Sequence, residues 1–359
     1  MNISNVSNTF QNASKTFNGT RYVEIEGARE WCLASLVLAW LLVILTITMN
    51  TAVIVCICSQ KKKSRLYFLL LNMALADLLT GIFDTFVNAT ERSLGYEDMT
   101  WAWFAGLYGC KIQRMAATAF AMTSNFILAA TSFDRAFVIA KPMINFKQGL
   151  VVQKYLTILC WVCSSLLSIP VYLAMYLIPV LLDKAYVLCF LDEKVISFST
   201  VTHYLLVFQY LLPLSIIVVS YEVLLCALGR RSASCGKRDS GGNGLMRIFN
   251  SGLPRIKTRS LKLMCGIVAG FVLAWTPYFT ISYLSIFGYN HPSLQVGGLM
   301  YYLNGIINPV VFCFSHRTEP VNSSTSSSSN ETATNASMIT KKSSRTFLPT
   351  DDMVNDKVL

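Results

Sequence analysis

Long apolar blocks are the feature that most constrains how this chain can fold. Each block is long enough for a helix to cross a bilayer core of roughly 30 Å, which takes about 20 residues. With 53% hydrophobic and 14% charged residues and a mean hydropathy of +0.49, the 359-residue chain is too apolar for a soluble domain of its length. The blocks are residues 33–58, 66–88, 107–138, 151–178, 200–228, 261–288 and 295–315. The strict alternation typical of a membrane β-barrel is absent from the sequence. The sequence therefore predicts an all-α membrane protein, a bundle of seven transmembrane helices.

Basic residues set the orientation of this bundle, because segments on the cytoplasmic side carry an excess of Lys and Arg. Residues 61–65 hold four basic residues, and residues 229–260 hold eight against a single acidic residue. Segments 1–31 and 89–106 carry charges of both signs. We therefore expect the N-terminus outside and the tail inside, in a multi-pass protein of the plasma membrane. The net charge of +11 follows from this topology, so nucleic acid is not expected as a partner.

This topology divides the chain into an extracellular segment 1–32, a transmembrane domain 33–315 and a cytoplasmic tail 316–359. The tail is rich in Ser, Thr and Asn, a composition that predicts disorder. The extracellular segment contains four glycosylation sequons, at Asn2, Asn5, Asn12 and Asn18. Three cysteines face the oxidising side of the membrane, Cys32, Cys110 and Cys189.

Several polar residues lie inside the predicted spans, where ionisable groups are costly and mark functional sites. Asp77 lies in the middle of the second block, and we group it with Ser124, Asn304 and Asn308. A carboxylate surrounded by neutral oxygens resembles a site for a small cation. The alternative is that these side chains hydrogen-bond one helix to another.

Prolines interrupt four of the blocks, at Pro170, Pro213, Pro277 and Pro309. Each removes one backbone hydrogen bond and kinks its helix, and the kink is either a hinge or a static feature of packing. The aromatic residues around Pro277, in AWTPYF, and the Asn before Pro309, in IINPVVF, favour moving joints at these two positions.

Taken together, these features resemble a rhodopsin-like (class A) G-protein-coupled receptor. The resemblance covers all seven blocks in order and rests on Asn50, MALAD ending in Asp77, Cys110, DRA at 134–136, Trp161, Pro213 with Tyr221, WTP and NPVVF. Within that class the chain is most similar to the vasopressin/oxytocin, neuropeptide S and crustacean cardioactive peptide receptor group. The matching stretches are SFDRAFVIAKPMINFKQG, LPLSIIVVSY, WTPYF and WFAGLYGCK. The gonadotropin-releasing-hormone receptor group is a near relative.

The resemblance implies roles for particular residues. It implies a disulfide between Cys110 and Cys189, which leaves Cys32 as a free thiol. It also implies that Arg135 is held by Asp134 at the cytoplasmic end of helix 3, and that the Arg is freed when helix 6 moves outward and a G protein binds. Such a pair has two states, with the Arg held or freed, and ligand and G protein both shift the equilibrium between them. The residues to which it assigns activation and G-protein coupling are Asp134, Arg135, Tyr221, Trp275, Pro277, Pro309 and Phe312.

The sequence departs from the family pattern at three positions. Ala136 replaces the Tyr after the Arg, Ala274 replaces the Cys before Trp275, and Phe312 replaces the Tyr of the helix 7 motif. The last change removes a hydroxyl that joins the water network of the active state. These departures bear on coupling strength and basal activity and leave the predicted fold unchanged.

Two ionisable residues are expected at the outer mouth of the bundle. Arg114 precedes Arg135 by 21 residues, which is about 31 Å along a helix and thus a whole membrane thickness. Asp84 follows Asp77 by seven residues and so points into the bundle near the outside. Arg114 and Asp84 either pair with each other or each bind ligand.

The resemblance also bears on the ligand. Ala117 stands where amine receptors carry Asp, so no carboxylate is present there to bind a ligand ammonium. Tyr302 stands where opsins carry the Schiff-base lysine, so retinal is not the expected ligand. Arg114 matches a Lys of vasopressin-type receptors. An apolar tunnel with a basic mouth suits a peptide, which in this group is amidated. Further polar or aromatic side chains are either ligand contacts or packing residues, namely Gln113, Gln209, Tyr278, Phe279, Tyr283 and Tyr302.

We therefore predict a neuropeptide receptor that signals through heterotrimeric G proteins, with a Gq and calcium preference inferred from relatives. The alternative is an orphan or chemosensory class A receptor for a small molecule. A transporter or channel would show internal repeats and a continuous polar path, and the sequence has neither. An enzyme is not expected, because the histidines are scattered at span edges, and no cofactor is expected beyond an allosteric sodium ion. The predicted partners are an extracellular peptide, a G protein, membrane lipid and arrestin, the last through phosphorylated residues of the tail.

Overall fold

A computed structural model describes residues 27–60, 65–96, 102–140, 146–181, 184–235, 255–289, 291 and 293–317. The predicted glycosylation sites Asn2, Asn5, Asn12 and Asn18 and the predicted tail beyond residue 317 lie outside the described residues. In the described part, six helical segments are long and apolar enough to cross a membrane. The 32-residue helix α12 (Arg255–Ile286) is the seventh. The predicted all-α bundle of transmembrane helices is confirmed.

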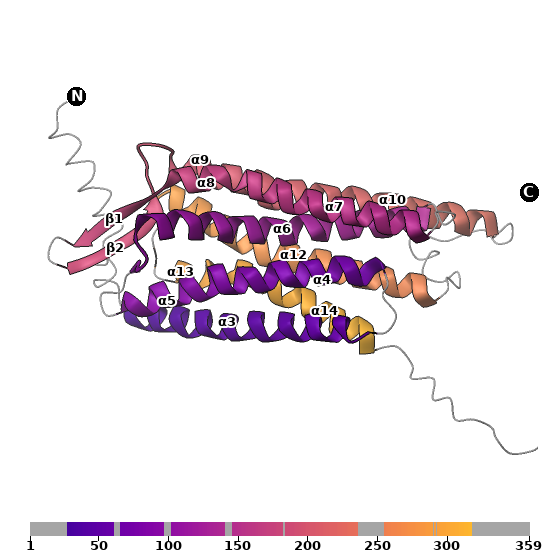
Figure 1. The fold of residues 1–359 in the computed structure, drawn as a ribbon, viewed down its shortest axis with the longest axis horizontal. Coiled ribbons are helices and arrows are strands. Elements are labelled where there is room, and N and C mark those ends of the chain that lie inside the picture. The colour runs from indigo at the N-terminus through magenta and orange to yellow at the C-terminus, as the bar shows by residue number, and fades with distance from the viewer. Residues whose placement is uncertain are drawn as a thin grey trace, which may run out of the picture. The chain divides into compact units, whose positions relative to one another are not determined.

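The second span is longer than predicted and contains a widened turn. Helix α4 (Arg65–Thr80) continues through a π-helical turn, η1 (Gly81–Thr85), into α5 (Phe86–Leu94), and packs beside α3 (Ala28–Cys58) (Figure 1). The prediction that the span ends at 88 and that 89–106 is an outer loop is therefore wrong. Polar residues in α5 lowered the hydropathy there, but Glu91 and Arg92 are buried in the last turns of the helix.

The fourth span ends in a β-hairpin that the sequence did not predict. Helix α7 (Phe146–Leu167) is followed by the short α8 (Ile169–Ala174), and Pro170 lies in the first turn of α8, where the missing N–H breaks no helical bond. Strand β1 (Met175–Leu181) then pairs antiparallel with β2 (Lys184–Leu191). The predicted helix up to residue 178 is wrong, because a short apolar run fits a strand as well as a helix.

The fifth and seventh spans are also built from several pieces. Each contains a non-α segment near the outer part of the bundle, as the second span does. The pieces of the fifth span are α9 (Phe198–Leu205), the π-helical η3 (Leu206–Leu211) and α10 (Leu212–Cys235). The pieces of the seventh are α13 (Leu294–Gly297), the 3₁₀ turn η4 (Met300–Leu303) and α14 (Asn304–Arg317).

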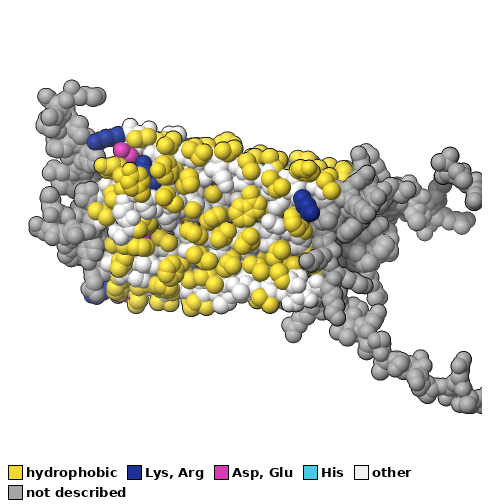
Figure 2. All heavy atoms as spheres, viewed as in Figure 1, with side chains coloured by type: hydrophobic (Ala, Val, Ile, Leu, Met, Phe, Trp, Pro, Cys, Tyr) yellow, Lys and Arg dark blue, Asp and Glu magenta, His cyan; other side chains and the backbone are white. Residues whose placement is uncertain are grey.

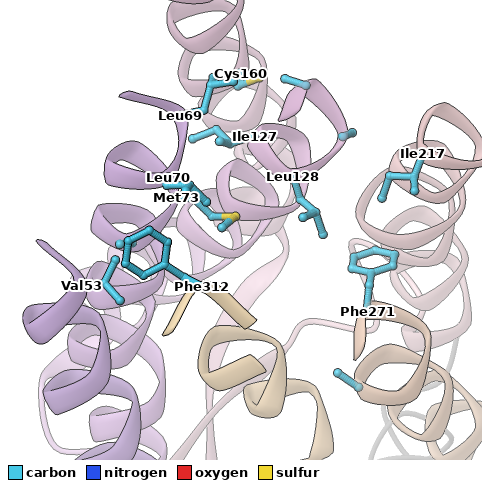
Figure 3. Packing of buried hydrophobic residues seen from close by; sticks show 14 of the residues in the cluster. Val53, Leu69, Leu70, Met73, Ile127, Leu128, Cys160, Ile217, Phe271 and Phe312 are labelled. Atoms are coloured by element: carbon cyan, nitrogen blue, oxygen red, sulfur yellow. The ribbon is translucent and has the colours of Figure 1, made fainter. Parts of the chain in front are cut away.

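Helix α6 (Gly106–Ala140), the third span, is the most buried of the long apolar helices and contacts α4, α7 and α10. A cluster of buried apolar side chains joins it to the surrounding helices (Figure 3). The cluster includes Val53 of α3, Met73 of α4, Leu128 of α6, Phe271 of α12 and Phe312 of α14. This core lies in the interior of the bundle, between the helices that carry the polar residues described below.

The outer surface of the helices is apolar. Figure 2 shows hydrophobic side chains spread along the visible face, with few charged groups. Large side chains such as Ile44, Val55, Leu159 and Leu273 are more than half exposed. A soluble protein rarely exposes so much apolar surface, whereas helices in a bilayer face acyl chains.

Candidate functional site

A buried ion pair lies at the outer end of the bundle, and it does not involve the residue expected. The Arg114 Nη2 atom is 2.7 Å from Oε1 and 2.8 Å from Oε2 of Glu91. The Glu91 side chain is 3% exposed and that of Arg114 is 21% exposed. Direct pairing of Arg114 with Asp84 was one of two predicted alternatives, and it is wrong because the extension of the second span places Glu91 there instead.

Asp84 lies on the π-helical turn η1 and is buried. Its Oδ2 atom accepts a hydrogen bond from the hydroxyl of Tyr301, at 2.7 Å. Gln113 of α6 contacts the same turn, because its Nε2 donates to the carbonyl oxygen of Phe83 at 2.7 Å. The Gln113 amide, predicted to face ligand, is thus engaged with the backbone of the second span.

Arg92 was not predicted as a site residue, yet it joins three spans. Its Nε donates to Oδ1 of Asn88, and its Nη1 lies 3.1 Å from Oγ of Ser35 and 3.4 Å from Oε1 of Gln295. The mouth therefore holds two acidic and two basic side chains: Asp84, Glu91 and Arg92, which are buried, and Arg114, which is half-buried. The predicted basic mouth is in fact of mixed charge.

Aromatic side chains form a continuous cluster on the sixth and seventh spans. The ring of Tyr301 lies 5.5 Å from that of Trp275, 4.8 Å from Tyr278 and 4.0 Å from Tyr302 between centroids. Phe279 stacks on Trp275 at 6.0 Å. Since Tyr301 also bonds Asp84, this aromatic cluster connects to the charged mouth.

The remaining predicted ligand residues are less tightly grouped. Ala117 and Gln209 are buried inside the bundle. Tyr283 packs edge-to-face on His203, with 5.3 Å between ring centroids. It lines a shallow groove of about 380 Å³ between the fifth and sixth spans, with Tyr210, Thr276, Phe279 and Phe287 among its walls.

The predicted cation-site residues converge in the centre of the bundle. Ser124 Oγ donates to Oδ1 of Asp77, and Asn308 Nδ2 donates to Oδ2 at 3.1 Å. Asn304 lines the same cavity of about 20 Å³, although its amide donates to Oδ1 of Asn125 at 3.1 Å. The volume is that of roughly one water molecule.

Two buried asparagines compensate for prolines. Proline lacks an N–H, so the carbonyl four residues earlier has no helical donor. Asn50 Nδ2 donates to Gly305 O at 2.9 Å, and Pro309 follows Gly305 by four residues. In the same way Asn125 Nδ2 donates to Gln209 O at 2.8 Å, four residues before Pro213. These contacts tie the third span to the fifth and the first to the seventh.

The cytoplasmic end of α6 carries a second ion pair. Arg135 Nη2 lies 2.6 Å from Oδ2 of Asp134. Gln153 of α7, which the sequence did not single out, donates from Nε2 to Oδ1 of Asp134 at 2.8 Å. Both carboxylate oxygens of Asp134 therefore accept a hydrogen bond.

At the outer end, the predicted disulfide is confirmed. Cys110 at the start of α6 is bonded to Cys189 on β2, so the hairpin is covalently attached to the third span. Cys32 has a free thiol, near Oε1 of Gln295.

Comparison with known families decides what this architecture is. Residues 49–312 match the family described as 7 transmembrane receptor (rhodopsin family). The chain belongs to this family. As a rhodopsin-family receptor it is a multi-pass plasma-membrane protein and a receptor, not an enzyme. Its ligand is a peptide or a small molecule, and it couples to G proteins.

Among curated relatives, this rhodopsin-family receptor resembles the human neuropeptide S receptor, with 26% identity over 81% of each chain. It resembles the gonadotropin-releasing hormone receptor of Octopus vulgaris at 27% identity, over 65% of this chain and 58% of that one. Rhodopsin of Myripristis violacea is 24% identical over 70% of this chain and 69% of its own length. The predicted class of receptor is confirmed.

The other predicted activation residues lie on the fifth, sixth and seventh spans. Trp275 is 2% exposed, and Pro277 lies inside α12 and Pro309 inside α14. Phe312, where the family pattern has Tyr, is buried and packs edge-to-face on Tyr67 of α4 at 6.3 Å. Tyr221 is half-buried on α10. Their roles in activation stay predictions.

Proposed function

We propose that this receptor binds a neuropeptide at its outer mouth and signals through heterotrimeric G proteins, with Gq and calcium as the expected pathway. The resemblance to neuropeptide S receptors supports a peptide ligand. The observation that carries the proposal is the group of acidic and basic side chains at the mouth, which the Tyr301–Asp84 hydrogen bond connects to the aromatic cluster.

A mouth of mixed charge suits a peptide better than a purely apolar ligand. Backbone amides and polar side chains of a peptide supply both donors and acceptors, which partly desolvated charges need as partners. Asp84 is one such acid, and it accepts a hydrogen bond from the Tyr301 hydroxyl at Oδ2. An amidated C-terminus carries both NH₂ donors and a carbonyl acceptor without net charge, which agrees with two acids facing two bases.

The proposal is tested by calcium mobilisation in cells that express the receptor. The probes are a panel of amidated neuropeptides, their free-acid forms and neuropeptide S. We expect a saturable response to at least one peptide, absent from cells without the receptor. A second variant, Ala117→Phe, fills the buried interior below the mouth and should reduce the response, which is compared at matched surface level.

A small-molecule receptor is the second candidate, and the similarity to rhodopsin favours it. Against an opsin-like ligand, Tyr302 stands where the resemblance expects the Schiff-base lysine. A response to small organic molecules together with silence towards the whole peptide panel would favour this candidate.

We also propose that Asp77 holds an allosteric sodium ion. Hard cations take oxygen ligands, and Asp77 and Ser124 supply them at one small cavity. Two buried hydroxyls that line it, Thr46 Oγ1 and Thr85 Oγ1, have no hydrogen-bond partner among the described residues. Unpaired oxygens around a carboxylate fit an ion with bound water. Arrestin recruitment through the tail and contacts with specific lipids remain proposals from composition alone.

A further inference from the structure

The Asp134–Arg135 pair poses a geometric problem that Gln153 solves. Adjacent residues on a helix project about 100° apart and do not face each other, so an i,i+1 ion pair is not favoured by the helix itself. The Arg side chain must fold back towards a carboxylate that is held still. In the structure the Asp134 carboxylate is held by the amide of Gln153, from a different helix.

Gln153 is built into this position. It is fully buried on α7, and α7 packs against α6. The Nε2–Oδ1 distance of 2.8 Å is that of a charge-assisted hydrogen bond. Its Oε1 atom has no hydrogen-bond partner among the described residues, so the bond to Asp134 is the polar contact that accounts for a buried amide here.

The sixth span cannot replace this restraint. The first residues of α12, RIKTRSLKLM at 255–264, contain no Asp or Glu and four basic residues. This stretch of sequence therefore contains no carboxylate that could take the place of Asp134. In the described part of the chain, Asp134 is the sole hydrogen-bond partner of Arg135. Restraint of Arg135 therefore depends on where Asp134 is held.

We propose that Gln153 is a positioning residue of the G-protein switch: its amide holds the Asp134 carboxylate drawn towards α7, and so keeps Arg135 from the G protein in the resting receptor. The hydrogen bond fixes that carboxylate on the α7 side of α6, and Arg135 follows. Ala136 contributes no side-chain polar group to this restraint.

The test is agonist-independent GTPγS binding by Gq, Gi and Gs heterotrimers reconstituted with purified receptor. Gln153→Met keeps the length and volume of the side chain but removes its donor. Loss of a hydrogen bond to an ionised group predicts a rise in basal exchange of roughly fivefold to tenfold. The inference rests on G-protein coupling but not on the proposed peptide, because no ligand is added. Failure of the peptide proposal would instead be seen as silence in the ligand screen.

Two further variants separate positioning from a general loss of packing. Thr157→Val removes a buried hydroxyl one turn along α7 that bonds only its own helix, at Gln153 O, and should leave basal exchange unchanged. In an Asp134→Asn background, Gln153→Met should add nothing, because the carboxylate it holds is gone. Basal exchange in Gln153→Met at or below that of the unmodified receptor would overturn the inference. So would an equal rise in the Asp134→Asn background or in Thr157→Val.

Discussion

Arg114 and Glu91 form an ion pair that links the third span to the outer end of the second, with 2.7 Å between Nη2 and Oε1. Asp84, which precedes Glu91 on the second span, bonds Tyr301 instead. In the mouth, one carboxylate therefore forms an ion pair and the other accepts a hydrogen bond from a tyrosine hydroxyl. From this difference we predict distinct roles for the two acids, Glu91 in folding and Asp84 in ligand binding.

The first prediction concerns the Arg114–Glu91 pair. Arg114→Ala leaves a buried carboxylate without its cation, because the Glu91 side chain is 3% exposed. Breaking a buried pair costs roughly 3–5 kcal/mol, so we expect a marked fall in surface level and in melting temperature. Flow cytometry and thermal unfolding in detergent measure both quantities.

The double variant Arg114→Ala/Glu91→Ala is the control for this prediction. It removes both charges, so it should recover much of the surface level lost in the single variant. Asp84→Asn should keep normal expression and instead reduce agonist potency. If the double variant is no better than Arg114→Ala, the pair does not account for the role of Arg114.

The second prediction concerns the disulfide. Cys110 and Cys189 are separated by 79 residues, and closing a loop of that length stabilises a chain by about 4.5 kcal/mol in the entropic account. Cys189→Ser should therefore lose surface expression and ligand binding. Cys32→Ser, which removes a free thiol, should keep both. Normal binding in Cys189→Ser would show that the hairpin needs no covalent attachment.

The third prediction concerns sodium. If the ion binds Asp77, sodium should lower agonist affinity in a saturable manner, because it stabilises the resting state. Asp77→Asn removes the charge and should abolish this dependence, while its one remaining oxygen can still accept the bond from Ser124. The measurement is agonist competition binding in sodium against N-methylglucamine buffer. Equal affinities in both buffers for the unmodified receptor would leave Asp77 as an interhelical hydrogen-bond partner only.

The fourth prediction concerns the asparagines that serve proline-freed carbonyls. Asn50→Leu leaves the half-buried Gly305 carbonyl without a donor, because residue 309 is Pro and supplies no helical N–H. We expect a loss of about 1–3 kcal/mol in stability, seen as a lower melting temperature. Asn72→Leu is the control, since in the described part of the chain the Asn72 amide donates to Phe68 O within its own helix. Equal destabilisation by both substitutions would refute this explanation of Asn50.

Much of the fold could be predicted from the sequence because the bilayer imposes a length and a polarity on every span. The apolar blocks, the prolines and the polar residues Asp77, Asn304 and Asn308 all stood out for that reason. The polar residues do meet in the centre of the bundle. Hydropathy could not predict a span whose inner face is polar, and so Glu91 and Arg92 were assigned to a loop.

Other features depend on long-range geometry that no local pattern encodes. A π-helical turn at Gly81–Thr85 rotates the helix that continues from it, and this continuation carries Glu91, the acid that pairs with Arg114. Gln153 looked like an ordinary polar residue near a span end, and only the packing of α7 on α6 brings it to Asp134. The exact bond partners of Asn50 and Asn125 could have been sought by asking which donor serves each proline-freed carbonyl.

The most direct test of the account is peptide-stimulated GTPγS binding by reconstituted heterotrimer, compared between the unmodified receptor and Arg135→Ala. The account predicts that a peptide active in the calcium screen accelerates exchange on the Gq heterotrimer. It predicts a loss of at least about tenfold in Arg135→Ala, which equals about 1.4 kcal/mol, with peptide binding retained. Peptide-stimulated exchange that is unchanged in Arg135→Ala, or a bound peptide that accelerates exchange on no heterotrimer, would contradict it.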